Sequence, residues 1–116
     1  MKYMATIWTE WDPDQAVDRE EASKYRDFAA EAAREGVLVG GDALHAPSSA
    51  TTVRVREEQP LLTDGPFAET KEQISGYFIL ECPNLDVAIA WAGRIPGARR
   101  GAVELRPVLD MNELMG

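Results

Sequence analysis

The chemistry available to this chain centres on His45, its only histidine. Histidine is the one side chain whose ordinary pKa lies near neutral pH, so it is the natural proton carrier. Asp64 begins the charged segment DGPFAETKE (residues 64–72) and sits in good turn chemistry, because Pro66 fixes φ and an aspartate accepts from its own following backbone. We predict a catalytic pair in which His45 moves the proton and Asp64 orients the imidazole. The alternative is structural, with Asp64 capping the loop and His45 on the surface.

A second set of side chains has the chemistry to hold a ligand. The candidate substrate-binding residues are Arg54, Glu69, Lys71, Tyr77 and Arg106. Arginine binds a carboxylate or phenolate through paired hydrogen bonds, and a tyrosine hydroxyl can donate to a ligand. The alternatives are salt bridges for the charged residues, an ion pair between Glu69 and Lys71 among them, and packing for Tyr77. Phe67 is expected to pack into the core or into a dimer seam.

Other chemistries find no support. One histidine and one cysteine, Cys82, do not make a structural zinc site, and no carboxylate spacing indicates Mg²⁺ or Ca²⁺. The segment GGDAL has neither the lysine nor the glycine pattern of a phosphate loop, and no G-x-S-x-G occurs. We therefore expect no metal and no cofactor, and an inert, buried Cys82.

Length and charge exclude broad classes of function. The 116 residues predict one domain, residues 1–116. A net charge of −8 argues against nucleic acid and anionic membranes as partners. A lone cysteine allows no internal disulfide, and the first residues do not resemble a signal peptide, so we expect a cytoplasmic protein.

Hydrophobic periodicity predicts an α+β fold. We expect two helices, at about 12–36 and 85–95, and six strands, at 2–8, 37–44, 51–57, 61–63, 74–82 and 102–109. The first helix is expected to start at DPDQ, with Asp12 as cap, and the glycine pair in 37–44 predicts a bulge or a close backbone approach. PGARRG is expected to be a loop and DMNELMG a tail. The order is β-α-β, a β-hairpin, then β-α-β, the ferredoxin-like plan with an antiparallel sheet.

Two strands are apolar on both faces. In 2–8, Tyr3, Ala5 and Ile7 alternate with Met4, Thr6 and Trp8, and 74–82 behaves likewise. Two helices cover only one face of such a sheet, and a solvated face should alternate to polar residues. We therefore predict a homodimer with two sheets face to face and a cleft between them. The alternative is a monomer with a few exposed aromatics.

The motifs resemble one known family. TDGPFAETKEQISGYFILE (63–81) is similar to the signature of the DGPF-domain branch of the YCII-related proteins. MKYM, GVLVGGDALHAP, ATTVRV, DVAIAWAGRIP and VELRPV agree in order along nearly the whole chain. The resemblance implies a member of the dimeric α/β-barrel superfamily.

The resemblance also suggests activities. YCII-type relatives are proposed to use a His–Asp arrangement in a cleft, and one acts in chloroaromatic breakdown. Members of the DGPF branch are often encoded beside alternative sigma factors. Our leading hypothesis is a cofactor-free acid/base enzyme, an isomerase or lyase acting on a small organic molecule such as an oxidised aromatic one. The alternative is a non-catalytic ligand-sensing or protein-binding module linked to sigma-factor regulation.

Overall fold

The computed structural model describes residues 1–12 and 18–116. Its strands are β1 (Lys2–Glu10), β2 (Leu38–Ala43), β3 (Thr51–Arg56), β4 (Gln59–Asp64), β5 (Glu72–Glu81) and β6 (Ala102–Pro107). Its helices are α1 (Arg19–Arg34), the 3₁₀ turn η1 (Pro47–Ser49), α2 (Leu85–Ala92), α3 (Gly97–Arg100) and α4 (Met111–Met115). All six predicted strands and both predicted helices are present, and the largest difference at an end is the start of α1 at Arg19.

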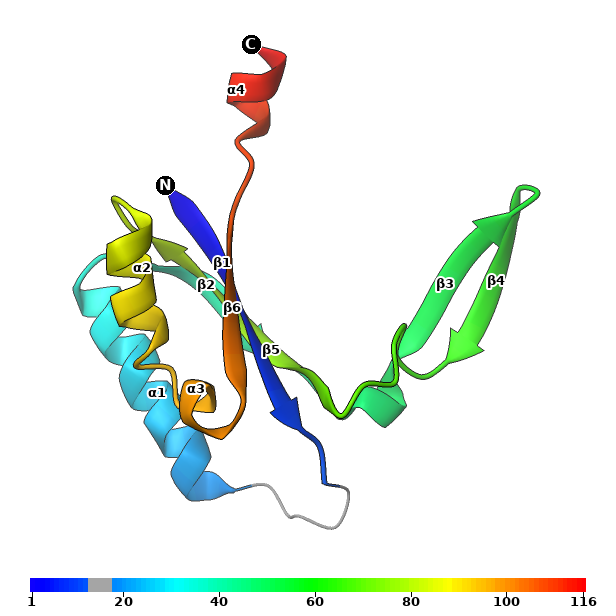
Figure 1. The fold of residues 1–116 in the computed structure, drawn as a ribbon, viewed down its shortest axis with the longest axis horizontal. Coiled ribbons are helices and arrows are strands. Elements are labelled where there is room, and N and C mark those ends of the chain that lie inside the picture. Colours follow the sequence, from blue (N-terminus) through cyan, green and yellow to red (C-terminus); the bar gives the residue numbers. More distant parts are fainter. Residues whose placement is uncertain (13–17) are drawn as a thin grey trace.

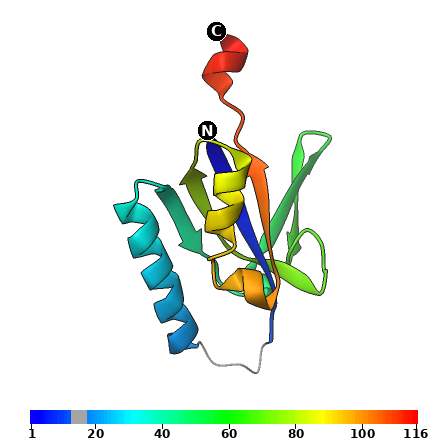
Figure 2. The same cartoon turned by 60° about the vertical axis from the view of Figure 1, so that its left-hand side comes forward.

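Four strands form one antiparallel sheet in the order β2-β5-β1-β6. The first and third strands of the β-α-β plan therefore lie at its centre, which is consistent with the predicted ferredoxin-like fold. Helices α1, α2 and α3 lie on one side of this sheet (Figures 1 and 2). In the described part of the chain, no helix covers the opposite side, which we call the open face.

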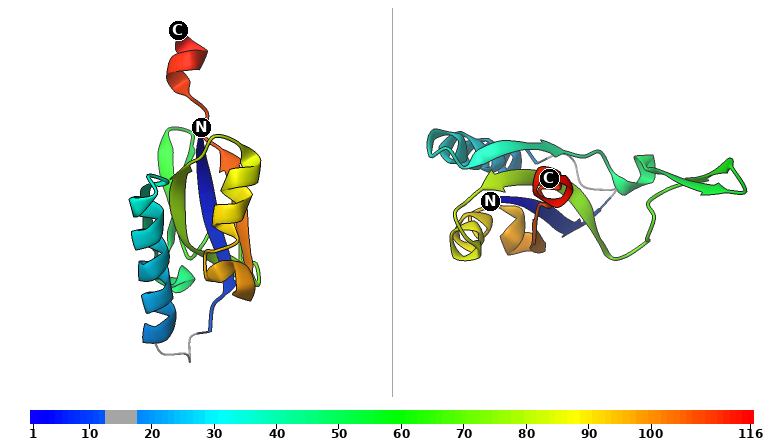
Figure 3. Two further views of the ribbon diagram at one scale, coloured as in Figure 1. Left: turned by 90° about the vertical axis from the view of Figure 1, so that its left-hand side faces the viewer. Right: turned by 90° about the horizontal axis from the view of Figure 1, so that it is seen from above.

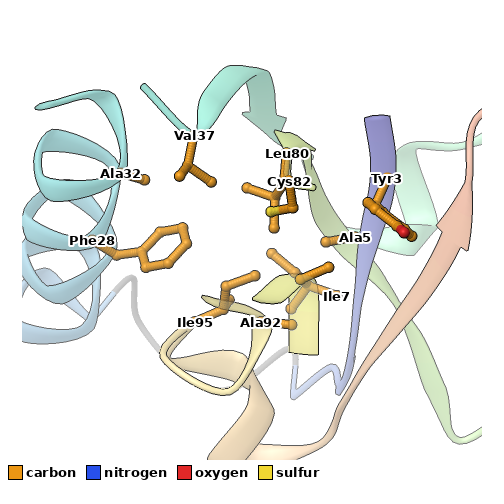
Figure 4. Close-up of a cluster of buried hydrophobic side chains, with 11 residues drawn as sticks. Tyr3, Ala5, Ile7, Phe28, Ala32, Val37, Leu80, Cys82, Ala92 and Ile95 are labelled. Atoms are coloured by element: carbon orange, nitrogen blue, oxygen red, sulfur yellow. The ribbon is translucent and has the colours of Figure 1, made fainter. Parts of the chain in front are cut away.

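The core lies between the sheet and the helices (Figure 4). Its buried residues are Tyr3, Ala5, Ile7, Phe28, Ala32, Val37, Leu80, Cys82, Ala88, Ala92 and Ile95. The Phe28 ring packs 5.1 Å from Phe78 and meets Trp91 edge-on at 6.2 Å. The alternation predicted for β1 and β5 is confirmed, as is the burial of Cys82.

Helix boundaries differ from the prediction where more than one residue could cap a helix. Asp18 caps α1 by accepting from the backbone N–H groups of Glu20 and Glu21, so the expected start at Asp12 is wrong for this helix. The rest of the predicted DPDQ start, residues 13–15, lies outside the described residues. Asn84 caps α2, because its side-chain oxygen accepts from the backbone N–H of Val87. PGARRG holds the short α3 and the tail holds α4, neither of which was expected.

The glycine pair in β2 marks a close approach of two backbones. The β2–β5 register shifts between Leu38 and Gly40. A Cβ at Gly41 would lie 2.5 Å from the backbone oxygen of Tyr77. Both predicted features are therefore present, and the approach fixes how β2 lies against β5.

Strands β3 and β4 form a separate two-stranded sheet, which we call the arm (residues 51–64). The arm stands away from the sheet, on the side opposite the helices (Figure 1), and the view from above shows the same separation (Figure 3). Apart from the half-buried Thr52, every arm residue is exposed. The arm turns at Glu57 and Glu58, both with positive φ.

Candidate functional site

A polar row crosses the open face. The strand registers place Asp42 beside Tyr77, Tyr77 beside Thr6, and Thr6 beside Glu104. One residue from each of the four strands thus forms a line across the sheet, and we call these four residues the polar row. Their neighbours along the strands, Gly41, Ala5 and Phe78 among them, point the other way, because successive side chains alternate between faces.

Apolar side chains flank the polar row on both sides. Met4 lies beside Ile79 on one side, and Trp8 lies beside Ile74 on the other. These four side chains are half-buried. A polar line between two apolar strips is suited to a small molecule with a flat apolar body and a few polar groups, since specific pockets combine apolar lining with few polar contacts.

Asp42 and Tyr77 form the strongest contact in the row. The Tyr77 hydroxyl donates to Asp42 Oδ2 at 2.9 Å. This hydrogen bond and the negative charge of Asp42 raise the pKa of Tyr77, because both favour the neutral phenol over the phenolate. Because the hydroxyl proton is donated to Asp42, the Tyr77 oxygen can act towards another group only as a hydrogen-bond acceptor. Tyr77 was predicted as a site residue, whereas Asp42 was missed.

Thr6 links the row to its apolar border. The Trp8 indole N–H donates to Thr6 Oγ1 at 2.9 Å, and the Thr6 hydroxyl donates to the backbone oxygen of Glu104 at 3.4 Å. The indole ring is therefore held in one orientation beside the row. Thr6 has a positioning role here that the sequence did not indicate.

Arg106 lies next to the row and pairs with Glu104 of its own strand, with Nη2 and Oε1 3.4 Å apart. In the isolated chain Arg106 therefore forms a salt bridge, which was the alternative to ligand binding. The Arg106 side chain is still largely exposed, at 78%. An exposed pair contributes little to stability and is readily exchanged for a bound anion.

His45 precedes the arm in the chain, whereas Asp64 is its last residue. His45 is exposed and follows the end of β2 by two residues, while Asp64 ends β4 opposite Thr51. The Gly65 N–H donates to the Ala50 oxygen at 2.7 Å and closes the base of the arm. Within the described residues no hydrogen bond or ion pair joins His45 to Asp64, and their pairing stays a prediction.

The other residues of the charged segment with a predicted role make no hydrogen bond to the polar row in the described structure. Phe67 is 75% exposed, so packing into the core of this chain is wrong. Its ring lies under the Arg54 guanidinium, 5.0 Å from the centroid. Lys71 pairs with Glu10 at 3.2 Å in place of the alternative partner Glu69, which is exposed.

A comparison with known protein families shows which family the chain belongs to. The model of the YCII-related domain matches residues 1–112. The chain belongs to the YCII-related family. An uncharacterised protein of Rhizobium meliloti is 38% identical to this YCII-related chain over 63 residues, which cover 53% of the chain and 51% of that protein. The chain thus spans about half the length of the curated relative it matches.

The open face of this YCII-related chain is rich in side-chain hydrogen bonds. In the described part of the chain, no group of three or more His, Cys, Asp or Glu side chains is placed to hold a metal ion. No described helix is long and apolar enough to cross a membrane. What the open face offers is a tyrosine oriented by a carboxylate, an arginine in an exchangeable pair, and apolar strips.

Proposed function

We propose that the open face binds a small organic molecule and supports cofactor-free acid/base chemistry on it, of the isomerase or lyase type. The polar row between two apolar strips, on a face that no described helix covers, carries this proposal. A second copy of the chain would cover the face and leave a cleft, as in a dimeric α/β barrel. An oxidised aromatic molecule fits the chemistry, because its ring suits Trp8 and Ile74 and its oxygen suits Tyr77.

Each residue has a role in this proposal. Tyr77, oriented by Asp42, accepts a hydrogen bond from a ligand hydroxyl, and Arg106 leaves Glu104 to hold a ligand anion. His45 carries the proton and Asp64 orients it when the dimer brings the arm base to the cleft. Arg54, Glu69 and Lys71 supply charge at the mouth of the cleft. A proton removed and returned at another carbon gives isomerisation, and loss of a leaving group gives elimination.

The branch of the family and the cellular compartment are also part of this proposal. Residues 64–67 spell DGPF, and we infer that the chain lies in the branch of that name and acts in the cytoplasm. The alternative function is a non-catalytic ligand sensor or a protein-binding module that contacts a sigma factor.

Binding is tested by titrating ¹⁵N-labelled protein with hydroxylated aromatic acids and following the tryptophan indole signals. We expect the Trp8 signal on the open face to shift and that of Trp91, on the helical side, to stay. Tyr77→Phe should weaken binding by up to roughly tenfold, which is the usual upper contribution of one hydrogen bond between neutral groups. Shifts at Trp91 alone would contradict the proposal.

Catalysis is tested separately with His45→Ala on any ligand found to be converted. We expect turnover to fall at least about 100-fold, the usual contribution of a general acid or base, with binding preserved. Binding without turnover in the unmodified protein would instead favour the ligand-sensing alternative.

A further inference from the structure

The chain exposes more surface than its mass requires. Its accessible surface is 8694 Å². A compact monomer of 12.8 kDa exposes about 6,300 Å². The surplus of roughly 2,400 Å² is what one subunit buries in a permanent homodimer. The radius of gyration agrees, at 16.2 Å against the roughly 13.4 Å of a compact chain of this length.

The arm contributes to this surplus, because every one of its residues except Thr52 is exposed. On one of its faces the register brings Val53 beside Leu62 and Val55 beside Pro60. Val53 and Val55 are each 59% exposed and Leu62 is 70% exposed. We call this the apolar face of the arm. An isolated two-stranded hairpin is marginally stable in water, so an arm with this composition needs a surface to pack on.

The same chain offers that surface. The arm projects on the side of the sheet away from α1 and α2, which is the side of the open face (Figures 1 and 3). The open face carries its own apolar strips, Met4 with Ile79 and Trp8 with Ile74. A two-fold pairing of identical chains joins each arm to the other chain's sheet and buries both surfaces at once. A second copy matches both surfaces because it carries the same arm and the same open face.

We propose that, in the homodimer, the arm of each chain packs its apolar face across the open side of the partner's sheet and closes the cleft over the partner's polar row. This inference rests on the homodimer of the proposed function and deepens it, because each site is then completed by the other chain. The opposite face of the arm, with Arg54 and Leu61, stays outside the contact.

The first test compares two substitutions on adjacent residues of β4. Leu62→Glu puts a carboxylate into the contact twice per dimer, and we expect the dimer dissociation constant to rise at least about 100-fold by sedimentation. Leu61→Glu makes the same chemical change on the other face and should leave the constant within about threefold. Both side chains are exposed in the single chain, so far-ultraviolet circular dichroism should be unchanged.

The outcomes separate the two proposals. A dimer unaffected by Leu62→Glu overturns the arm contact and leaves the sheet-to-sheet homodimer standing. An unmodified protein that sediments as a monomer overturns both.

The second test locates the arm on the partner. A spin label on Leu61→Cys is mixed with unlabelled, ¹⁵N-enriched chains, so that any broadening crosses between subunits. The native Cys82 is 2% exposed and burial raises the pKa of its thiol, so the label attaches to the arm. We expect the Trp8 indole signal to broaden and that of Trp91 to be spared. Broadening of Trp91 with Trp8 spared would place the arm on the helical side and overturn the inference.

Discussion

At the scale of single residues, the centre of the site is the hydrogen bond between Tyr77 and Asp42. Alternation along 74–82 was enough to predict that Tyr77 faces away from the core. Asp42 was not predicted, because its place beside Tyr77 depends on the pairing of β2 with β5 and on their shifted register. One local signal was available, since aspartate is depleted in strands and Asp42 lies in the middle of one.

The titration of Tyr77 tests this contact. Asp42 raises the pKa of Tyr77 by accepting its proton in a hydrogen bond and by repelling the phenolate. Asp42→Asn removes the negative charge, so we expect the pKa of Tyr77 to fall, measured by ultraviolet absorbance of the phenolate. Tyr77→Phe identifies which of the three tyrosines gives the signal. An unchanged titration in Asp42→Asn would show that the two side chains do not interact in solution.

The glycine pair gives a matched comparison. A Cβ at Gly41 would meet the backbone of Tyr77, whereas a Cβ at Gly40 has no atom within 4 Å. We expect Gly41→Ala to lower the free energy of unfolding by about 1–3 kcal/mol. Gly40→Ala should change it little, and urea denaturation measures both. Equal losses in the two variants would mean that the close approach is absent.

At the scale of elements, the sequence was most informative where the pattern was longest. The strands alternate and α1 and α2 carry apolar residues at helical spacing, so their existence and core faces could be predicted. Helices α3 and α4 span four and five residues, too few for a periodic signal. The start of α1 was misplaced because Asp12 and Asp18 both have capping chemistry, and only the fold selects Asp18.

The turn of the arm is conformationally strained, because two glutamates adopt positive φ there. Glu57 and Glu58 have φ of 51° and 65°, the conformation that Asn-Gly prefers in a two-residue hairpin. Replacing the pair by Asn-Gly should stabilise the arm by about 1 kcal/mol, which slows amide exchange in β3 and β4 about fivefold. The double alanine variant removes the charges and keeps the strain, so its exchange should not slow. Slowing in both variants would point to charge repulsion as the cause.

At the scale of the whole molecule, the sequence indicated a sheet with one apolar face too many but not the position of the arm. Val53 and Val55 alternate with Thr52 and Arg54 as in a half-covered strand, yet neither face of the arm is covered in the single chain. The alternation is therefore consistent with the proposed cover of one arm face by a second chain. Phe67, in the charged segment that follows the arm, is likewise exposed in the single chain. Its predicted place in a dimer seam stays a prediction.

Sedimentation equilibrium of the unmodified protein tests the central claim, that a second copy covers the open face, most directly. The surplus surface and the open polar row predict a mass of twice the 12.8 kDa of one chain at micromolar concentration. A mass of 12.8 kDa that persists as the concentration rises would contradict it.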